Sequence, residues 1–422
     1  MTPFFCRIGG GEGARCAERV FIKNGSENTK DGNVEKKKGK EKRKVRRRKT
    51  IVFVSGNRGA EDAFDLSRKA TGVKWEWCFV ATGKRLVKAQ RTSRPLAPRA
   101  IPSAGKESDL HFEVPFDTFR QRGGRLAEPM EKAIAGFRDV YRLVSPALLL
   151  LPEIGREYLA AALAASTENI PIVLRHPLAV PTNETPRSIY DALSKMSHYH
   201  LLPNAGAAER LRDLPKKRTA FVGAWELDPL TELKYLTRNQ LEKRLGKSLG
   251  KRPLFIDVMG SGRRFEEMLR LVFAVLEEYT DSFLFLVKPV FNDRTAAGIK
   301  LMESFSLLHP QRSALVPFWD QELVYSAMKH SEAWIGNHRR GFFVTPYFHL
   351  PAVFLGKDDS YSDWESAASV LLVEPEKKEF SAAMKKILAT RFRNSCKKVK
   401  SPYGNGQAVK KTVTALSRWI KE

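Results

Sequence analysis

Cysteine is scarce in this chain of 422 residues, and the few that occur do not cluster. The four cysteines are Cys6, Cys16, Cys78 and Cys396. They form no CxxC pair and no Cys/His group with the spacing of metal ligands, so the usual sequence patterns of a metal site are absent. We therefore expect a reduced, cytoplasmic compartment, and we predict no metal and no cofactor.

Long apolar runs are also missing. A helix that spans a bilayer needs about 20 consecutive apolar residues, whereas runs such as residues 147–151 are far shorter. The first residues lack the apolar stretch of a signal peptide. These absences favour a soluble protein without a transmembrane segment.

Negative charge is the third shortage, since 73 Lys and Arg oppose 47 Asp and Glu and leave a net charge of +26. Residues 1–50 hold 16 cations and 6 anions, and eleven of these cations lie between Lys36 and Lys49. Such a run cannot bury a core and is predicted to be a disordered tail. Two interpretations stay open, a solubilising extension or a tether for nucleic acid or an anionic membrane surface. The remaining chain is still basic, which suits an anionic ligand.

Short apolar runs alternate with helix-prone segments from Thr50 onward. Residues 51–55 predict a buried strand that runs into a glycine turn, as at the start of a Rossmann-like domain. The same alternation restarts at residues 254–258, after a charged connector at 233–249. The pattern predicts two domains, each with a parallel sheet covered on both faces. Ligands of such domains bind at the carboxyl ends of the strands, so a cleft is expected there.

The remaining elements are expected at well-separated positions along both halves. Further strands are predicted at residues 75–81, 147–151, 171–174, 283–287, 314–316, 333–335 and 351–355. Helices are predicted at residues 60–70, 126–144, 158–165 and 263–278. Residues 84–115 hold scattered proline, serine and basic residues and are expected to form a long loop with little regular structure.

Three segments carry a family resemblance. They are LLLLPEIGREYLAAALAASTENIPI with IYDALSKMSHYHLL between Leu148 and Leu202, IGNHRRGFFVTPYFHLPAVFLG from Ile335, and SPYGNGQA from Ser401. In this order they resemble the GDRxE turn, NIPI strand, IGNSSSG loop and NPYGDGxA motif of the UDP-N-acetylglucosamine 2-epimerase family, especially its hydrolysing branch. Weaker matches begin near Ser55, so the resemblance covers about residues 51–422.

The resemblance implies an α/β, glycosyltransferase-B-like fold, in which two Rossmann-like domains face a central cleft and the last helix crosses back to the first domain. The expected parts are a basic tail at 1–50, an N-terminal domain at 51–228, a nucleotide-binding domain at 229–400 and a C-terminal helix at 401–422. Family members often form dimers, which makes a homodimer an expectation here.

The family reaction removes the proton at sugar C2 and expels UDP. Re-adding UDP gives UDP-N-acetylmannosamine, whereas adding water gives free N-acetylmannosamine. This chemistry needs a base near C2, an acid on the other face, and cations or backbone N–H groups for the leaving diphosphate.

Two residues are assigned to catalysis by the resemblance. Glu157 keeps the glutamate of the GDRxE turn, although Ile154 stands at its aspartate and cannot transfer a proton. His176 matches a family histidine at the end of the NIPI strand, where Ala179 replaces a glutamate. His176 is equally well read as a structural histidine.

A second set is assigned to the nucleotide and its diphosphate. The set is Arg58, Asp293, Asn337, His338, Arg339, Arg340 and Gly341. Arg58 matches the arginine of a GTR turn, and His338 to Arg340 replace a serine run before the conserved glycine. Two guanidiniums beside a helix N-terminus would still attract an anion. Val344 stands where the family glutamate holds the ribose, which argues against ordinary nucleoside recognition.

The family histidine after the first strand of the second domain is absent. Asp257, Ser261 and Arg263 are the polar residues of that region, and its GSGR turn is either a phosphate-facing helix start or a plain loop. Three functions stay open: a nucleotide-sugar 2-epimerase with a rebuilt site, a non-catalytic relative that binds an anion or a partner, and a glycosyltransferase on the same fold.

Overall fold

A computed structural model describes most of the two predicted domains. The described residues are 6–7, 49–55, 75–82, 110–114, 116, 127–178, 184–211, 213, 215–356 and 367–420. They group into two compact units, which are treated separately here. The first comprises residues 1–177, 181–201 and 413–422, and the second comprises residues 178–180 and 202–412.

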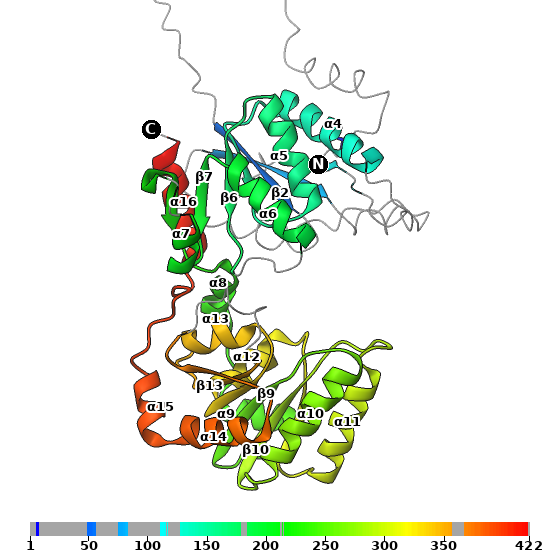
Figure 1. Ribbon diagram of the computed structural model, residues 1–422, viewed down its shortest axis with the longest axis vertical. Coiled ribbons are helices and arrows are strands. Elements are labelled where there is room, and N and C mark those ends of the chain that lie inside the picture. The colour runs from blue at the N-terminus through cyan, green and yellow to red at the C-terminus, as the bar shows by residue number, and fades with distance from the viewer. Residues whose placement is uncertain are drawn as a thin grey trace, which may run out of the picture. The chain divides into compact units, whose positions relative to one another are not determined.

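The first unit is built on a parallel sheet in the strand order β1-β4-β3-β2-β5-β6-β7 (Figure 1). Its strands are β1 (Cys6–Arg7), β2 (Lys49–Ser55), β3 (Trp75–Thr82), β4 (Leu110–Val114), β5 (Leu148–Leu151), β6 (Ile172–Arg175) and β7 (Tyr199–Leu202). Its helices are α4 (Ala127–Val144), α5 (Arg156–Thr167) and α6 (Glu184–Met196). The chain leaves β2 toward β3 and β4 and returns on the other side at β5, so the strand order reverses between β2 and β5.

An alanine-rich helix lets the first unit pack tightly. Six residues of α5 are buried, and five of them are alanines. They share a core with the inward side chains of β5, Leu149 and Leu151, and with Phe137 and Tyr141 of α4. Small side chains let a helix approach its neighbours closely, which explains an alanine run beside a strand of four leucines.

The second unit holds a six-stranded parallel sheet in the order β11-β10-β9-β12-β13-β14. These strands are β9 (Arg252–Asp257), β10 (Ser282–Lys288), β11 (Ser313–Pro317), β12 (Ala333–Gly336), β13 (Ala352–Leu355) and β14 (Val370–Val373). The main helices are α9 (Arg238–Leu245), α10 (Gly262–Leu276), α11 (Ala296–Leu308), α12 (Gln321–Lys329), α13 (Arg340–Tyr347), α14 (Lys377–Leu388) and α15 (Thr390–Cys396). Shorter elements precede them: α7 (Ala205–Arg210), η1 (Lys216–Arg218), β8 (Thr219–Phe221), η2 (Trp225–Leu227) and α8 (Asp228–Glu232).

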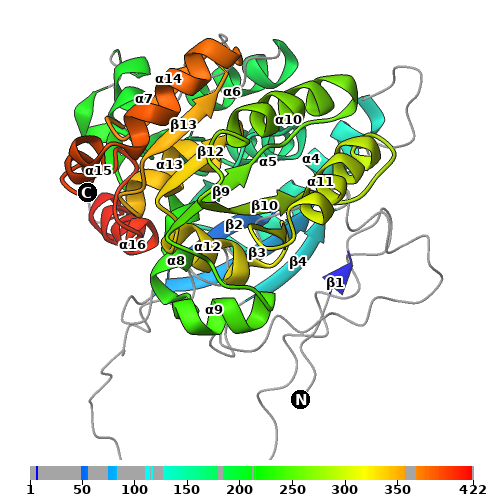
Figure 2. The ribbon, with the colours of Figure 1, turned by 90° about the horizontal axis from the view of Figure 1, so that it is seen from below.

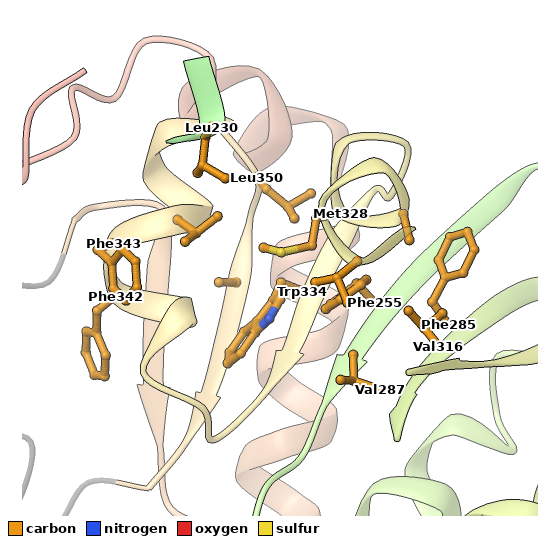
Figure 3. Close-up of a cluster of buried hydrophobic side chains, with 14 of the residues drawn as sticks. Leu230, Phe255, Phe285, Val287, Val316, Met328, Trp334, Phe342, Phe343 and Leu350 are labelled. Carbon is orange, nitrogen blue, oxygen red and sulfur yellow. The ribbon is translucent and has the colours of Figure 1, made fainter. Parts of the chain in front are cut away.

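Both faces of the second sheet are buried, as a central parallel sheet requires. Side chains that point to one face, such as Phe255 and Trp334, pack with α12 and α13, and Figure 3 shows this cluster. The alternate side chains, such as Leu254 and Ile256, pack with α10, α11 and α14. Helices α10 and α11 lie side by side on that face (Figure 2).

The PYGNG turn fixes the start of the last helix, α16 (Ala408–Trp419). A Cβ atom on Gly406 (φ +76°) would lie 2.3 Å from the Thr231 side chain, so only glycine fits there. The buried carboxylate of Asp228 accepts hydrogen bonds from the backbone N–H groups of Ala408 (2.7 Å) and Val409 (2.8 Å). From Val413 onward the chain groups with the first unit, as the resemblance implied for the last helix.

Most predicted elements are confirmed with small shifts of their ends, but the loop expected at 84–115 is partly wrong. Leu110–Val114 is the strand β4, and its Phe112 and Val114 side chains are buried. Within the predicted tail, Cys6 and Arg7 form β1, which pairs with β4. The helix predicted at 60–70 and most of the basic tail lie outside the described residues. The predicted domain boundaries stay a prediction.

Candidate functional site

The strand order locates a candidate site in the second unit. The chain runs from β9 outward to β10 and β11, then returns to β12 on the other side of β9, so the order reverses between β9 and β12. Ligands of open parallel sheets bind at such a switch point, outside the carboxyl ends of the strands. Asp257 ends β9 and Gly336 ends β12. A Cβ atom on Gly336 would lie 2.1 Å from the backbone oxygen of Asp257, so glycine allows these strand ends to meet.

Three charged or titratable side chains converge at this switch point. The Asp257 side chain is fully buried, and its Oδ2 lies 3.5 Å from Arg340 Nε and 3.3 Å from His338 Nδ1. The Arg340 guanidinium is almost fully buried and also donates from Nε to His338 Nδ1 at 3.2 Å. Because β9 and β12 are neighbours, residues 81 and 83 positions apart in the sequence form one cluster.

Aromatic rings complete the surroundings of this cluster. The Arg340 guanidinium lies 4.8 Å from the centre of the Phe318 ring and 5.8 Å from that of Tyr325. The His338 ring meets Phe318 edge to face, with centroids 5.7 Å apart. A guanidinium against aromatic faces loses water but keeps favourable electrostatics. The cluster is therefore packed as well as charged.

The charges determine the state of Asp257. Burial by itself raises the pKa of the carboxyl, but the nearby Arg340 guanidinium and the His338 ring outweigh it, so the pKa lies below its ordinary value. Asp257 is thus a carboxylate paired with a guanidinium. Arg340 Nη1 has no hydrogen-bond partner within the described part of the chain, and a buried donor of this kind is available to an anion.

The residues around the cluster divide into structural and exposed ones. The Asn337 side chain bonds both the N–H (2.7 Å) and the carbonyl (2.8 Å) of Met259, which holds the loop after β9. A Cβ atom on Gly341 would lie 2.6 Å from the Trp334 ring, so this glycine is needed for packing. Arg339 is exposed at the start of α13, whereas Val344 is fully buried in the core.

The GSGR turn precedes α10 without a cap from the Ser261 side chain. The Gly262 N–H (φ +60°) donates to the Arg294 carbonyl at 2.8 Å, and Arg263 pairs with Glu267 one turn along the exposed helix surface. Asp293 is exposed in the turn after β10. These contacts are those of an ordinary loop and helix start.

In the first unit, polar residues follow the ends of β5 and β6. Glu157 lies in the first turn of α5 and folds over Gly155, since a Cβ atom there would be 2.7 Å from its Oε2. Tyr158 donates to Glu153 at 3.1 Å, and Arg175 Nε donates to the Pro152 carbonyl at 2.6 Å. Carboxylates and a guanidinium therefore gather at this edge of the first sheet.

His176 is held in a buried hydrogen-bonded chain. Its Nδ1 lies 3.1 Å from the Tyr190 hydroxyl, and its Nε2 lies 2.9 Å from His200 Nδ1. His176 is 1 % exposed, so both nitrogens are engaged inside the first unit. This geometry matches the structural reading of His176 that the sequence left open, and a catalytic role for it stays a prediction.

The two units, each a Rossmann-like sheet with its own switch point, define an α/β protein with two Rossmann-like domains. A sequence profile described as UDP-N-acetylglucosamine 2-epimerase matches residues 106–417, well over half of the chain. The chain therefore belongs to the UDP-N-acetylglucosamine 2-epimerase family.

Individual relatives agree with this assignment. The UDP-N,N'-diacetylbacillosamine 2-epimerase (hydrolyzing) of Legionella pneumophila is 25% identical over 58% of this chain and 65% of its own length, slightly less than two thirds. A UDP-N-acetylglucosamine 2-epimerase structure from Listeria monocytogenes has a TM-score of 0.66 at 15% identity and covers 89% of this chain and 97% of its own. An epimerase from Neisseria meningitidis bound to UDP-GlcNAc gives 0.65 at 16%, covering 87% and 100%. The expected glycosyltransferase-B-like fold is confirmed.

The sequence identified several residues of the site but not the side chains that contact them in the structure. The loop from Asn337 to Gly341 was found from the motif, but Asp257 as the counter-charge of Arg340 was missed, although it lies within the strand predicted at residues 254–258. Arg58 lies outside the described residues. In the described part of the chain, His, Cys, Asp and Glu form no group of three that could hold a metal. No helix there is long and apolar enough to cross a membrane.

Proposed function

We propose that this protein acts on a UDP-activated N-acetylated amino sugar, expelling UDP and inverting the configuration at C2, with water completing the reaction to give the free sugar. The observation that carries this proposal is the family match, which runs through both units from residue 106 to residue 417. The switch-point cluster, with a buried guanidinium nitrogen that has no hydrogen-bond partner in the described residues, supports it, because an anionic leaving group needs such a donor.

The proposed roles follow the chemistry of each side chain. Glu157 is the base for the C2 proton, since it is a half-exposed carboxylate at the start of a helix beside a strand end. His176 contributes as a buried, oriented imidazole within its hydrogen-bonded chain. The diphosphate is held by the loop from His338 to Gly341, and Arg58, Asn337 and Asp293 belong to the nucleotide side.

A non-catalytic relative that binds a nucleotide or a partner is the second candidate. Two apolar replacements favour it, because they are integrated into the packing. Val344 is fully buried in the core of the second unit, and Ile154 packs against the core of the first. A carboxylate could not return to these positions without repacking, so any catalysis relies on other groups.

Incorporation of deuterium tests the proposal. The protein is incubated in deuterated water with UDP-N-acetylglucosamine and, separately, with UDP-N,N'-diacetylbacillosamine. We expect deuterium at C2 of the product, free UDP and the C2-inverted sugar. Glu157→Gln keeps the size of the side chain but removes the base, and a loss of about 100-fold or more in rate is expected.

The matched control is Glu153→Gln, which changes a carboxylate four residues earlier that already accepts from Tyr158. It should retain most of the rate. If high enzyme concentrations yield neither deuterium nor UDP while calorimetry shows that UDP binds, the non-catalytic candidate replaces the epimerase.

We also propose a cytoplasmic protein, supported by the scarcity of cysteine and by Cys396, which is a free, buried thiol. Homodimer formation and a contact of the basic tail with nucleic acid or an anionic membrane surface remain proposals that rest on the family and on charge. Sedimentation tests homodimer formation and the contact of the tail. Repeating it at a second, higher salt concentration should weaken a contact made by charge.

A further inference from the structure

One nitrogen of His338 lies between a donor and an acceptor. Nδ1 is 3.2 Å from Arg340 Nε, which donates to it, and 3.3 Å from Asp257 Oδ2, which can only accept. A neutral imidazole with an unprotonated Nδ1 takes the bond from Arg340. An imidazolium has a proton on Nδ1 and donates it to Asp257. The site is therefore built to hold both protonation states of one ring.

Of the three side chains in the cluster, His338 alone reaches solvent to a useful extent. Its side chain is 20% exposed, compared with 4% for Arg340 and 0% for Asp257. The ring is also held by the edge contact with Phe318. Here the imidazole faces outward at a switch point, and a carboxylate lies behind it. An acid or base that is held in a fixed orientation has this arrangement.

We infer that His338 is the proton donor to the departing diphosphate of the nucleotide sugar, and that Asp257 is the positioning residue that orients and stabilises its imidazolium. The inference rests on the proposed function and deepens it, since it gives a chemical role to a residue that stands where the family has serine. A serine hydroxyl can donate a hydrogen bond, but it cannot serve as a charged acid at neutral pH.

The step balances in atoms and charge. A base removes the C2 proton, the C2–H electron pair becomes the C1–C2 double bond, and the C1–O pair leaves with the diphosphate. The imidazolium gives its Nε2 proton to the diphosphate oxygen and becomes neutral. Water then adds its O–H to C1 and gives its second proton to the imidazole. C2 takes a proton from solvent on the face opposite the base, and the base releases the proton that it removed to solvent.

Neighbouring charges are compatible with this role. Arg340 is the nearest cation, and Asp257 balances it within the cluster. Arg339 precedes it on the exposed side. From α12 the titratable group is Tyr325, whose pKa is raised by burial, so it stays neutral. With Asp257 and Arg340 paired, the charge of the outward-facing edge depends on His338 and Arg339.

The experiment compares His338→Gln with His309→Gln. His309 is a matched control in the same unit, because its Nε2 lies 2.9 Å from Glu277 Oε1 and its side chain is 24% exposed. Release of UDP from UDP-N-acetylglucosamine is followed as a function of pH. We expect His338→Gln to lower kcat by about 100-fold with KM within about threefold, and to remove the fall of kcat at high pH that a protonated donor imposes.

Asp257→Asn tests the positioning role. It should lower kcat by about tenfold and move the high-pH fall to lower pH, because the imidazolium loses its counter-charge. A merely structural carboxylate would lower the amount of folded protein without moving the pH profile. Asp257→Asn leaves the charge of Arg340 unpaired. The double variant Asp257→Asn/Arg340→Gln removes that charge as well, and the high-pH fall of kcat should still lie at lower pH than in wild type.

The outcomes separate the two proposals. If wild-type protein turns over but His338→Gln matches His309→Gln in rate and pH profile, the inference is overturned and the proposed function stands. If His338→Gln changes the pH profile of kcat but Asp257→Asn leaves it unchanged, the positioning role of Asp257 is overturned. If wild-type protein neither exchanges deuterium nor releases UDP, the proposed function fails first and the inference fails with it.

Discussion

Two buried polar clusters lie at the carboxyl edges of the two sheets, and they differ in charge. In the first unit, Tyr190, His176 and His200 form a chain of hydrogen bonds between groups that can all be neutral. In the second, Asp257 and Arg340 are an ion pair, with His338 beside them. Burying neutral partners that bond each other costs little, whereas burying charges is tolerated only while every charge has its counterpart.

The difference indicates which edge is better suited to bind an anion. A buried neutral chain of this kind mainly specifies packing. The charged cluster contains a guanidinium nitrogen without a hydrogen-bond partner in the described part of the chain and a ring that reaches solvent. A fold retains such a costly arrangement more readily for recognition or catalysis than for stability.

The largest expected effect comes from breaking the charged cluster. Arg340→Met leaves Asp257 buried and unpaired, and we expect a loss of about 3–5 kcal/mol in the free energy of unfolding. Chemical denaturation followed by circular dichroism measures it. Arg244→Met is the control, since Arg244 makes two exposed ion pairs at 2.6 Å and should lose about 1 kcal/mol or less. Equal losses in the two variants would contradict the comparison.

A second buried carboxylate sharpens the comparison, because it accepts hydrogen bonds from peptide groups. Asp228 accepts from two backbone N–H groups at the start of α16. Asp228→Ala leaves both donors unsatisfied, and a loss of about 1–3 kcal/mol is expected in the same denaturation experiment. Limited proteolysis should then cleave the C-terminal segment first. Unchanged protection of that segment would count against this role.

Acid should weaken the charged cluster and not the neutral one. The folded-state pKa of Asp257 is below its unfolded value of about 3.9, so its contribution is present above that pH and is lost as pH falls through the folded pKa. We expect the unfolding free energy to drop more steeply below about pH 4 in wild type than in Asp257→Asn/Arg340→Met. Parallel slopes would show that Asp257 does not carry the effect.

The smallest expected effect is at the neutral cluster. Tyr190→Phe removes one hydroxyl that bonds His176, and a loss of about 1–2 kcal/mol is expected, with no change in the slope below pH 4. His198→Gln serves as a nearby control, because His198 bonds a backbone N–H at the edge of the same sheet. A loss of unfolding free energy as large as that of Arg340→Met would contradict the comparison, because it would indicate a charge within the chain of Tyr190, His176 and His200.

Local pattern was enough to predict most strands, because a buried strand needs an apolar run whatever surrounds it. The four leucines of β5 and the apolar start of β9 show this directly. β4 was missed because proline, serine and basic residues precede it and only its alternate residues, Leu110, Phe112 and Val114, are apolar. Tyr199–Leu202 was not among the predicted strands, yet it forms β7 with His200 buried inside.

The sequence by itself determined the α/β class, the family and the positions of the motif loops, because these depend on local apolar runs and ordered motifs. Only the tertiary structure decided the partners of the charged residues. Arg339 and Arg340 are adjacent in sequence, yet one is exposed and the other is buried. Asp257 meets His338 and Arg340 because the crossover returns β12 to the free side of β9, and no local pattern encodes that neighbourhood.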